Sequence, residues 1–271
     1  MDDIQGEQKS GDRGDAVFPV TLMPPDGQNA TCFTESLMKM LVHDSEHGQH
    51  LTSPLFLPTS PMQMAANRNM GARLFLDETD ADYLLFVDSD MGWDPDAVDL
   101  LLDAADPMDH PVIGALCFGL RKEETNNQGG FLTVPFPTIY DWRPDKHANM
   151  GFVPRYNYSP GAITQASATG AAFLLIHRNV LTAMRKTVGD EWFTRAQLSA
   201  GGQVMGEDIS FCARLGQAGI PLFVHTGVKT THAKTVWVGE DFYQGARVLS
   251  SLAARSDGDV ENLAERVNAD A

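Results

Sequence analysis

Hydrophobic residues along the chain follow two different spacings, which predicts strands that alternate with helices. Short continuous apolar runs such as 83–87 are typical of strands that are covered on both faces. Other segments, such as 32–43, repeat apolar residues every three or four positions, as amphipathic helices do. We predict strands over 17–23, 54–58, 83–87, 112–118, 171–177 and 221–225, and helices over 32–43, 61–77, 97–105, 179–186 and from 208 onward.

This alternation predicts an α/β fold in which a mostly parallel central sheet carries helices on both faces. In such folds, ligands bind beyond the carboxyl ends of the parallel strands. The acidic sequence Asp88-Ser89-Asp90 directly follows a predicted strand and therefore falls at this edge. Ser60 and Pro61 supply an N-cap and a first-turn proline, from which we expect the second helix to start.

We expect one catalytic domain over residues 17–236. Residues 1–16 contain charged residues, Gly and Ser without a hydrophobic pattern, which indicates a disordered arm. Residues 237–271 are expected to form a helical, charged extension. The stretch 119–160 is rich in Gly, Pro, Asn and aromatic residues and is too long for an ordinary connection, so we expect a loop region that contacts substrate.

The charge balance narrows the possible partners. Twenty Lys and Arg against 36 Asp and Glu give a net charge of −16. Such a chain repels nucleic acid unless its basic residues cluster, and the sequence has no such cluster. A phosphorylated substrate would instead need a divalent cation to neutralise its charge.

Cysteine spacing and hydropathy indicate the compartment. Cys32, Cys117 and Cys212 are odd in number and far apart, which favours neither a disulfide framework nor a zinc site. The N-terminal sequence is polar and acidic, and no apolar run approaches the roughly 18 residues of a membrane span. We therefore expect a cytoplasmic protein without a membrane span.

Asp88 and Asp90 form the first candidate site. At a spacing of two in an extended chain, both side chains point to one side and can face one hard cation. A pair of solvated acids in a turn is the alternative. A calcium-binding loop is a further alternative, but the position where it requires Gly is Trp93, and the preceding segment is a predicted strand instead of a helix.

The second and third candidates lie later in the chain. Asp208 follows Gly206-Glu207 at the start of a predicted helix, where the helix dipole favours the ionised form that a general base needs. A simple helix cap is the alternative. His232 follows a predicted strand, and its imidazole can complete a metal site that carboxylates begin. A structural or surface histidine is the alternative there.

The order of these motifs resembles that of a known family. A helix with Asn67 and Arg68 is followed by YLLFVDSD, SATGAAFLLIHRNVL and GEDISFCARLGQAGIPLFVHTGVKTTH. Over about residues 17–236 this resembles the GT-A glycosyltransferases, in particular family 2 and its compact bacteriophage-encoded members. The resemblance implies a Rossmann-like GT-A domain, a Mn²⁺ or Mg²⁺ cofactor and a nucleotide-sugar donor, with UDP favoured and GDP possible. The acceptor would be a protein or a glycan, and a phage-encoded enzyme would act in the host cytoplasm.

The resemblance also implies roles for individual residues. Asp90 would ligate the metal directly, with Asp88 on the ribose or on the metal's water shell and His232 as a further ligand. Asp208 would be the catalytic base, with Glu207 beside it. Arg68 would contact the nucleotide, and Thr169 and Gly170 would border the donor sugar; a solvated helix face and a loop that enters a core strand are the alternatives. Asn67, Asp26 and Ser89 are further candidates for contact with the nucleotide-sugar. Apart from the resemblance, Trp142, Tyr156 and Trp192 could stack on a sugar ring of the acceptor, with simple packing as the alternative.

Two departures from the family pattern concern the nucleotide and the acceptor. The first strand leads into MPPDGQNA instead of the commoner short polar sequence, and the Q-x-x-R-W signature is absent. A single displacement with Asp208 as base would invert the anomeric centre, while retention stays open. A nucleotidyltransferase and a non-catalytic carbohydrate- or calcium-binding module are the alternative functions.

Overall fold

The structure is a computed structural model. It describes residues 15–124, 131–144, 150–197, 204–236, 238–240, 242, 243 and 246. The chain divides into two compact units, one of residues 1–118 with 137–233 and the other of residues 119–136 with 234–271. The predicted disordered arm and most of the predicted C-terminal extension lie outside the described residues.

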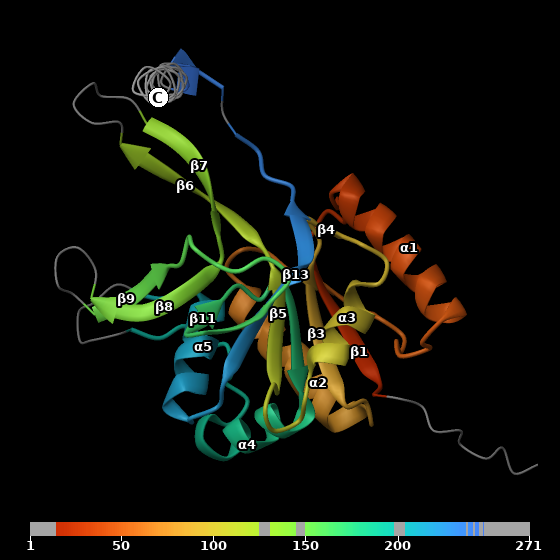
Figure 1. Cartoon of the computed structure of the whole chain (residues 1–271). Helices are drawn as coiled ribbons and strands as arrows, with labels where there is room; N and C mark the ends of the chain where they lie inside the picture. The colour runs from red at the N-terminus through yellow and green to blue at the C-terminus, as the bar shows by residue number, and fades with distance from the viewer. Residues whose placement is uncertain are drawn as a thin grey trace, which may run out of the picture. The chain divides into compact units, whose positions relative to one another are not determined.

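The first unit is built on a central sheet whose strand order is β10-β13-β5-β12-β3-β1-β2, with β4 paired to β13 (Figure 1). Strands β2, β1, β3, β5 and β13 run in one direction. Strand β12 runs the opposite way between β3 and β5, and β10 pairs antiparallel with β13. The strands are β1 (Val17–Met23), β2 (Leu55–Pro58), β3 (Tyr83–Asp88), β4 (Met91–Trp93), β5 (Val112–Leu116), β10 (Ile163–Ala166), β12 (Phe173–His177) and β13 (Leu222–His232).

Helices cover both faces of this sheet. Side chains of β3 alternate between two hydrophobic clusters: Leu84 and Phe86 pack with α2, α4 and α5, whereas Leu85 and Val87 pack with α1 and α3. This alternation follows from the two-residue repeat of a strand, and it makes β3 the buried centre of the fold. The predicted α/β class with a mostly parallel sheet flanked by helices is confirmed. The helices are α1 (Thr31–Glu46), α2 (Met64–Glu78), α3 (Ala97–Ala104), α4 (Arg178–Val188) and α5 (Glu207–Gln217).

Helix α2 starts later than predicted. Residues 61–63 form a turn, and the helix begins at Met64. The hydroxyl of Ser60 donates to Gln63 Oε1 and caps no helical N–H group. The prediction of a start at Pro61 is therefore wrong, because the Ser-Pro sequence favours a turn as readily as a first helical turn.

The stretch 119–160 is also different from the prediction, since most of its described residues form strands. They are β6 (Phe118–Glu124), β7 (Phe131–Pro137), β8 (Ile139–Pro144) and β9 (Met150–Pro154). Strands β6 and β7 pair with each other, while β8 pairs with β9 and with β11 (Ala168–Thr169). Gly and Pro residues interrupt these strands and hide the two-residue hydrophobic repeat that identifies a strand in the sequence.

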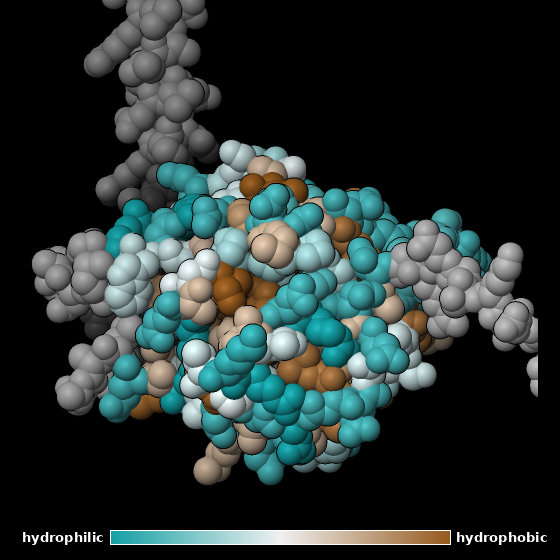
Figure 2. Space-filling model, turned by 90° about the horizontal axis from the view of Figure 1, so that it is seen from below, coloured by the Kyte–Doolittle hydropathy of each residue, from teal (hydrophilic) through white to brown (hydrophobic). Residues whose placement is uncertain are grey.

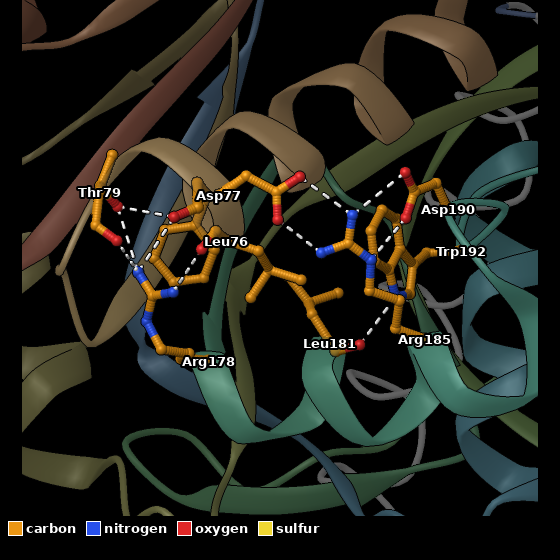
Figure 3. A network of polar contacts seen from close by, with 9 residues as sticks. Leu76, Asp77, Thr79, Arg178, Leu181, Arg185, Asp190 and Trp192 are labelled. Atoms are coloured by element: carbon orange, nitrogen blue, oxygen red, sulfur yellow. Dashed lines mark hydrogen bonds and ion pairs between the residues drawn. The ribbon is translucent and has the colours of Figure 1, made fainter.

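A polar clamp joins α4 to the carboxyl end of α2 (Figure 3). Arg178 donates to the carbonyl oxygens of Phe75, Leu76 and Thr79, which are among the last carbonyls of α2 and its cap. Farther along α4, Arg185 forms ion pairs with Asp77 and Asp190.

The surface is mainly hydrophilic on the face that Figure 2 presents, where hydrophobic residues appear only in small separate patches. None of the described helices combines the length and the apolar character that a membrane crossing requires.

Candidate functional site

Two of the predicted acidic residues, Asp88 and Asp90, lie at the carboxyl edge of the central sheet together with His232. Strand β3 ends at Asp88, and the chain then turns into β4, which pairs antiparallel with the end of β13. In this pairing Met91 lies opposite His232, which places the imidazole beside Asp90 although 142 residues separate the two in sequence. Asp90 Oδ2 and His232 Nε2 are 3.1 Å apart. The sheet itself therefore assembles a carboxylate and an imidazole.

The close packing of β4 on β13 depends on a glycine. A Cβ atom at Gly92 would lie 2.5 Å from the Thr231 hydroxyl oxygen and 3.1 Å from Cys32 Cβ, closer than such atoms approach. A larger residue at Gly92 would require the side chains of Thr231 and Cys32 to move away from β4. This segment is a strand, so the helix-loop-helix geometry of the calcium-loop alternative is absent from it.

The hydrogen bonds of His232 determine which of its nitrogens is available. Nδ1 lies 2.8 Å from the carbonyl oxygen of Phe118, and because a carbonyl only accepts, Nδ1 carries a proton. In the neutral imidazole Nε2 then presents a lone pair to a carboxylate oxygen of Asp90. Two acceptors at this distance require a proton or a cation between them. A histidine whose other nitrogen is bonded to a backbone carbonyl is the usual form of a metal ligand.

Asp88 faces a buried arginine. Its Oδ1 accepts a hydrogen bond of 2.9 Å from Arg68 Nη2, and Arg68 is only 2% exposed. Arg68 also donates to the carbonyl oxygen of Ala171, and its side chain lies against the ring of Phe86. Burial raises the pKa of Asp88 and Arg68 opposes this rise, while the neighbouring Asp90 adds to it. Arg68 therefore provides the positive charge that offsets the negative charges at this edge.

The same arginine reaches the start of α5. Arg68 Nε lies 3.8 Å from Glu207 Oε1 and has no hydrogen-bond partner among the described residues. Glu207 is itself buried and lies 3.7 Å from Arg195 on its other oxygen. Arg68 thus connects the end of β3 with the residue that precedes Asp208.

Asp208 lies in the first turn of α5. Its Oδ1 accepts a hydrogen bond of 2.7 Å from the N–H of Ile209, and a Cβ atom at Gly206 would come within 2.9 Å of that same oxygen. Burial raises the pKa of Asp208 to about 6, and the negative charge of Glu207 adds to the rise. A carboxylate with a pKa near 6 is largely ionised at neutral pH and is still basic enough to accept a proton in a reaction.

The donor set fits a divalent metal ion with two protein ligands, Asp90 and His232. Carboxylate and imidazole together suit Mn²⁺, and a metal at a nucleotide site normally takes its remaining ligands from phosphate and water. Among the described residues, no three His, Cys, Asp or Glu side chains are arranged to hold one ion. The predicted set of three is therefore not assembled, because the carboxylate of Asp88 points to Arg68.

The residues predicted to bind the nucleotide-sugar have different surroundings. Asn67 donates through its amide to Pro58 O and Thr59 Oγ1, at the end of β2. Asp26 is exposed in the loop after β1, where its carboxylate accepts a bond from Gln28 N–H. Ser89 is buried, and its carbonyl accepts a bond from Ala30 N–H in front of α1. These contacts are structural, and nucleotide contacts of Asn67, Asp26 and Ser89 stay predictions.

The position of Arg68 agrees neither with a solvated helix face nor with a direct contact to the nucleotide. Its side chain is enclosed in the core, so the alternative of a solvated helix face is wrong. The predicted direct contact with the nucleotide has no exposed guanidinium surface to use. The sequence pattern of α2 could not reveal this, because a single arginine on an amphipathic helix usually faces solvent.

Thr169 ends β11 and Gly170 follows it before β12, next to the predicted base. A Cβ atom at Gly170 would lie 3.8 Å from Asp208 Oδ2 and the same distance from Thr138 Oγ1. Thr169 is buried, and its carbonyl accepts a hydrogen bond from the Cys212 thiol on α5. Gly170 therefore borders Asp208, whereas Thr169 connects this segment to the helix that carries the base.

The three aromatic residues predicted to contact the acceptor have two different positions. Trp192 is completely buried, and its indole N–H donates to Leu181 O, so it has no free ring face and this prediction is wrong. Trp142 and Tyr156 are 43% and 48% exposed. These two remain accessible from solvent.

The structure adds two residues that the sequence did not indicate. Arg195 is half-exposed beside Glu207 and brings a positive charge to the rim of the site. Tyr140 is near enough to Asp208 for the carboxylate to raise its pKa, although burial is the larger cause of a rise to about 12. Neither residue belongs to a local motif, and both reach the site only through the packing of β8 and of the segment before α5.

Comparisons with known proteins give similarity to solved structures. No family model matches the chain, and no curated protein matches its sequence. The crystal structure of A197 from STIV has 15% identity and a TM-score of 0.45, over 82% of this chain and 86% of that chain. The crystal structure of GalNAc-T7 with UDP, GalNAc and Mn²⁺ has 8% identity and a TM-score of 0.49, over 82% of this chain and 44% of that chain. Similarity at this level identifies no activity, so the proposals below rest on the geometry of the site.

Proposed function

We propose that the protein is a glycosyltransferase of the GT-A type that transfers a sugar from a nucleotide-sugar donor to an acceptor hydroxyl. The observation that carries the proposal is a carboxylate-imidazole pair at the sheet edge together with a separate, partly buried carboxylate in the first turn of α5. Asp90 and His232 form the pair, and Asp208 is the separate carboxylate. The buried Arg68 lies between Asp88 and Glu207 and couples the two parts of the site.

The two parts suit different tasks. Asp90 and His232 would hold Mn²⁺ or Mg²⁺, which when bound neutralises the diphosphate of a departing nucleotide. Asp208 lies on a different element, in the first turn of α5, and would remove the proton from the acceptor hydroxyl. Its pKa of about 6 fits this task, because the base must be ionised before the reaction and protonated after the hydroxyl attacks.

A direct attack by the acceptor would invert the anomeric configuration. The base and the pair that holds the diphosphate would then lie on different sides of the transferred sugar. Arg68 would keep its position throughout, because its contacts are to Asp88, Glu207 and a backbone carbonyl. Its role is to hold the ends of β3 and α5 in register, and contact with the sugar is left to other groups.

A thermal-shift screen of UDP-, GDP- and dTDP-sugars with and without Mn²⁺ tests the donor site. The wild type should be stabilised by one nucleotide class and only with metal, since a ligand that binds the folded state raises the melting temperature. Asp90→Ala should lose the shift. Glu35→Ala, on the exposed surface of α1, is the matched acidic control and should keep it.

No metal-dependent shift with any nucleotide-sugar would contradict the proposal. A shift with free nucleoside triphosphates and release of pyrophosphate would favour the nucleotidyltransferase instead. Binding of donor without any transfer or donor hydrolysis would favour a non-catalytic binding module.

A further inference from the structure

Strand β13 is irregular in its middle, between the part that belongs to the central sheet and the part that carries His232. His225 lies opposite Ala115 of β5, and the next paired residue, Lys229, lies opposite Leu116. Between these two pairs β13 advances by four residues while β5 advances by one, so three residues of β13 have no counterpart in β5. Such a bulge bends a strand and changes the direction of the side chains that follow it.

The bulge is the point at which β13 changes its neighbours. Before the bulge, the strand pairs with β10 on one side and with β5 on the other. After it, residues 230–232 pair with β4. His232 lies beside Asp90 because this last part of the strand follows β4. The conformation of residues 226–228 therefore determines where the imidazole of His232 lies.

The side chain of His225 holds the backbone at the start of the bulge. Its Nδ1 accepts a hydrogen bond of 3.1 Å from the N–H of Gly227. A ring nitrogen that accepts carries no proton, so the imidazole is neutral and its proton is on Nε2. A Cβ atom at Gly227 would lie 2.8 Å from Cε1 and 3.1 Å from Nδ1 of this ring. The glycine thus leaves the room in which the ring can reach the N–H group.

Thr226 holds the same bulge from the side of β10. Its hydroxyl accepts a hydrogen bond of 2.8 Å from the N–H of Ala162 and donates one of 2.6 Å to the carbonyl oxygen of Ser159. These bonds do not change with pH, because a threonine hydroxyl does not titrate in this range. Of the two side chains that hold the bulge, only the imidazole of His225 can change its charge near neutral pH.

The surroundings of His225 favour its neutral form. Its neighbours in the sheet, Ala115 and Ile163, are apolar. The titratable His110 lies on the same face of β13, but against the ring of Phe223, at a centroid distance of 4.4 Å. Burial lowers the pKa of His225 from its usual 6.5, a backbone hydrogen bond opposes this shift, and no charged side chain of the described residues contributes to it.

The direction of this pKa shift determines when the bond to Gly227 exists. Above about pH 6.5 the imidazole of His225 is neutral in the folded and the unfolded chain, and the bond is complete. As the pH falls through the lowered pKa, Nδ1 takes up a proton and can only donate. The N–H of Gly227 then loses its acceptor.

We propose that His225 is a positioning residue, which sets the place of His232 by holding the N–H of Gly227. The proposal rests on the proposed function, since the task of His232 in metal binding belongs to that function. With neutral His225, the bulge presents the imidazole of His232 to Asp90 and to the carbonyl oxygen of Phe118. Protonation of His225 releases Gly227, and the end of β13 is then held less firmly against β4.

Long-range ¹H–¹⁵N NMR at about pH 8 tests both histidines without metal or donor. In the wild type, His225 should be the Nε2–H tautomer because it accepts from Gly227, and His232 should be the Nδ1–H tautomer because it donates to Phe118. In His225→Ala, the single tautomer of His232 should be replaced by an average of the two. An unchanged Nδ1–H tautomer of His232 in His225→Ala overturns the proposal.

Titration with Mn²⁺ alone, followed by the EPR signal of the free ion, measures the consequence for the site. At about pH 8, His225→Ala should bind Mn²⁺ about tenfold more weakly than the wild type, as for other residues that orient a metal ligand. His225→Asn should bind almost as well as the wild type, because an asparagine oxygen can accept from the N–H two residues later. Wild-type affinity in His225→Ala, or an equal loss in His225→Asn, overturns the proposal.

The pH profile separates the imidazole from a side chain that only fills space. Between about pH 8 and pH 5.5, the Mn²⁺ affinity of the wild type should fall more steeply than that of His225→Asn, because asparagine takes up no proton. Asp90 and His232 titrate in both proteins, so the difference between the two profiles belongs to position 225. Parallel profiles overturn the proposal.

His177 provides a matched control. Its Nδ1 accepts from the N–H of Asn179 at the same distance of 3.1 Å, and burial lowers its pKa too, but it lies at the start of α4. His177→Ala should leave the tautomer of His232 and the Mn²⁺ affinity unchanged. A loss of affinity equal to that of His225→Ala would mean that any such bond serves the whole fold, and would overturn a specific role of His225.

Gly227→Ala tests the same bond from its other partner. The added Cβ atom would displace the ring of His225, so this variant should reproduce the changes of His225→Ala. Gly151→Ala is its control, because a Cβ atom at Gly151 meets nothing within 4 Å. Wild-type Mn²⁺ affinity and an unchanged His232 tautomer in Gly227→Ala overturn the proposal.

Failure of this proposal and failure of the proposed function give different results. If the tautomer of His232 depends on His225 but the wild type binds no Mn²⁺, the metal site of the proposed function is contradicted and the positioning of His232 is supported. If Mn²⁺ and donor bind normally in His225→Ala, the positioning role is overturned and the proposed function is unaffected.

Discussion

Two arginine-centred networks contact the same helix, α2, and differ in how deeply the arginine is buried. Near the start of α2, the buried Arg68 faces Asp88 and Glu207, with Asp90 and Asp208 close by. At the other end of α2, Arg185 on α4 pairs with Asp77 and Asp190, as Figure 3 shows. The first network has a fully buried arginine near several carboxylates, of which Glu207 is buried and the others are partly buried, whereas in the second the arginine and both of its carboxylates are partly exposed.

The pKa shifts show the consequence. The hydrogen bond from Arg185 lowers the pKa of Asp77, so that this carboxylate is more easily ionised in the folded protein. At the other end of the helix, burial raises the pKa of both Asp88 and Asp208 despite Arg68. Ionised carboxylates therefore cost stability in the first network and add to it in the second. Such a cost is typical of functional sites.

Removal of Arg68 should have the largest effect on stability. Arg68→Met leaves Asp88 and Glu207 without their buried counter-charge, and breaking a buried ion pair in this way costs about 3–5 kcal/mol. Urea denaturation measures the loss. The double variant Arg68→Met/Asp88→Asn should recover part of it, because the uncompensated charge is then gone. A loss below about 1 kcal/mol in Arg68→Met would show that the network is not held by charge.

The pH dependence of Asp208→Asn should be the next largest effect. The pKa of Asp208 is raised from 3.8 to about 6, so the folded wild type loses stability as the pH rises from about 4 to 6 and keeps that loss above 6. The Asn variant retains an oxygen for Ile209 N–H and avoids the loss. It should be more stable than the wild type at pH 8, by on the order of 1–3 kcal/mol, and equal to it near pH 4. A constant difference in melting curves across this range would contradict the raised pKa.

A substitution of Arg178 tests the other polar contacts at the carboxyl end of α2, which Figure 3 shows beside those of Arg185. Arg178→Ala uncovers the carbonyl oxygens of Phe75, Leu76 and Thr79 at the end of α2, and should destabilise the protein by about 1–3 kcal/mol. Donor binding should persist in the folded variant, because the clamp does not touch the acidic edge. An equal loss of stability and of donor affinity would mean that the two ends of α2 are not independent.

The smallest effect is expected at Asp77. Its carboxylate is exposed beside Arg185, where salt screens the pair and Arg185 keeps Asp190 as a partner. Asp77→Asn should shift the urea midpoint only slightly, and the shift should shrink as NaCl is added. A large loss of stability that does not depend on salt would mean that this exposed pair contributes as much as the buried pair of Arg68 and Asp88.

The parts of the fold with strong local patterns could be predicted from the sequence. The run Tyr83 to Val87 is apolar throughout, and its strand was predicted nearly to the residue. The direction of β12 could not be predicted, because nothing in Phe173 to His177 indicates which way the strand runs. The length of β13 was hidden because Lys229 and Thr231 alternate with buried residues in a mainly polar segment.

The sequence indicated which residues form the site better than it indicated how their side chains are arranged. Asp90 and His232 were both predicted, and the pairing of β4 with β13 explains why residues so far apart in the chain meet. The burial of Arg68 could not be predicted, because its guanidinium contacts Asp88, Ala171 and Glu207, which come from three distant segments of the chain.

The central claim is that Asp208 acts in catalysis while Asp90 and His232 serve donor binding. The most direct test measures two quantities on Asp208→Asn: the metal-dependent affinity for the donor and the rate of sugar transfer. We expect an unchanged donor affinity together with a loss of turnover of about 10²- to 10⁴-fold, because a general base is removed. Unchanged turnover, or a parallel loss of donor binding, would contradict it.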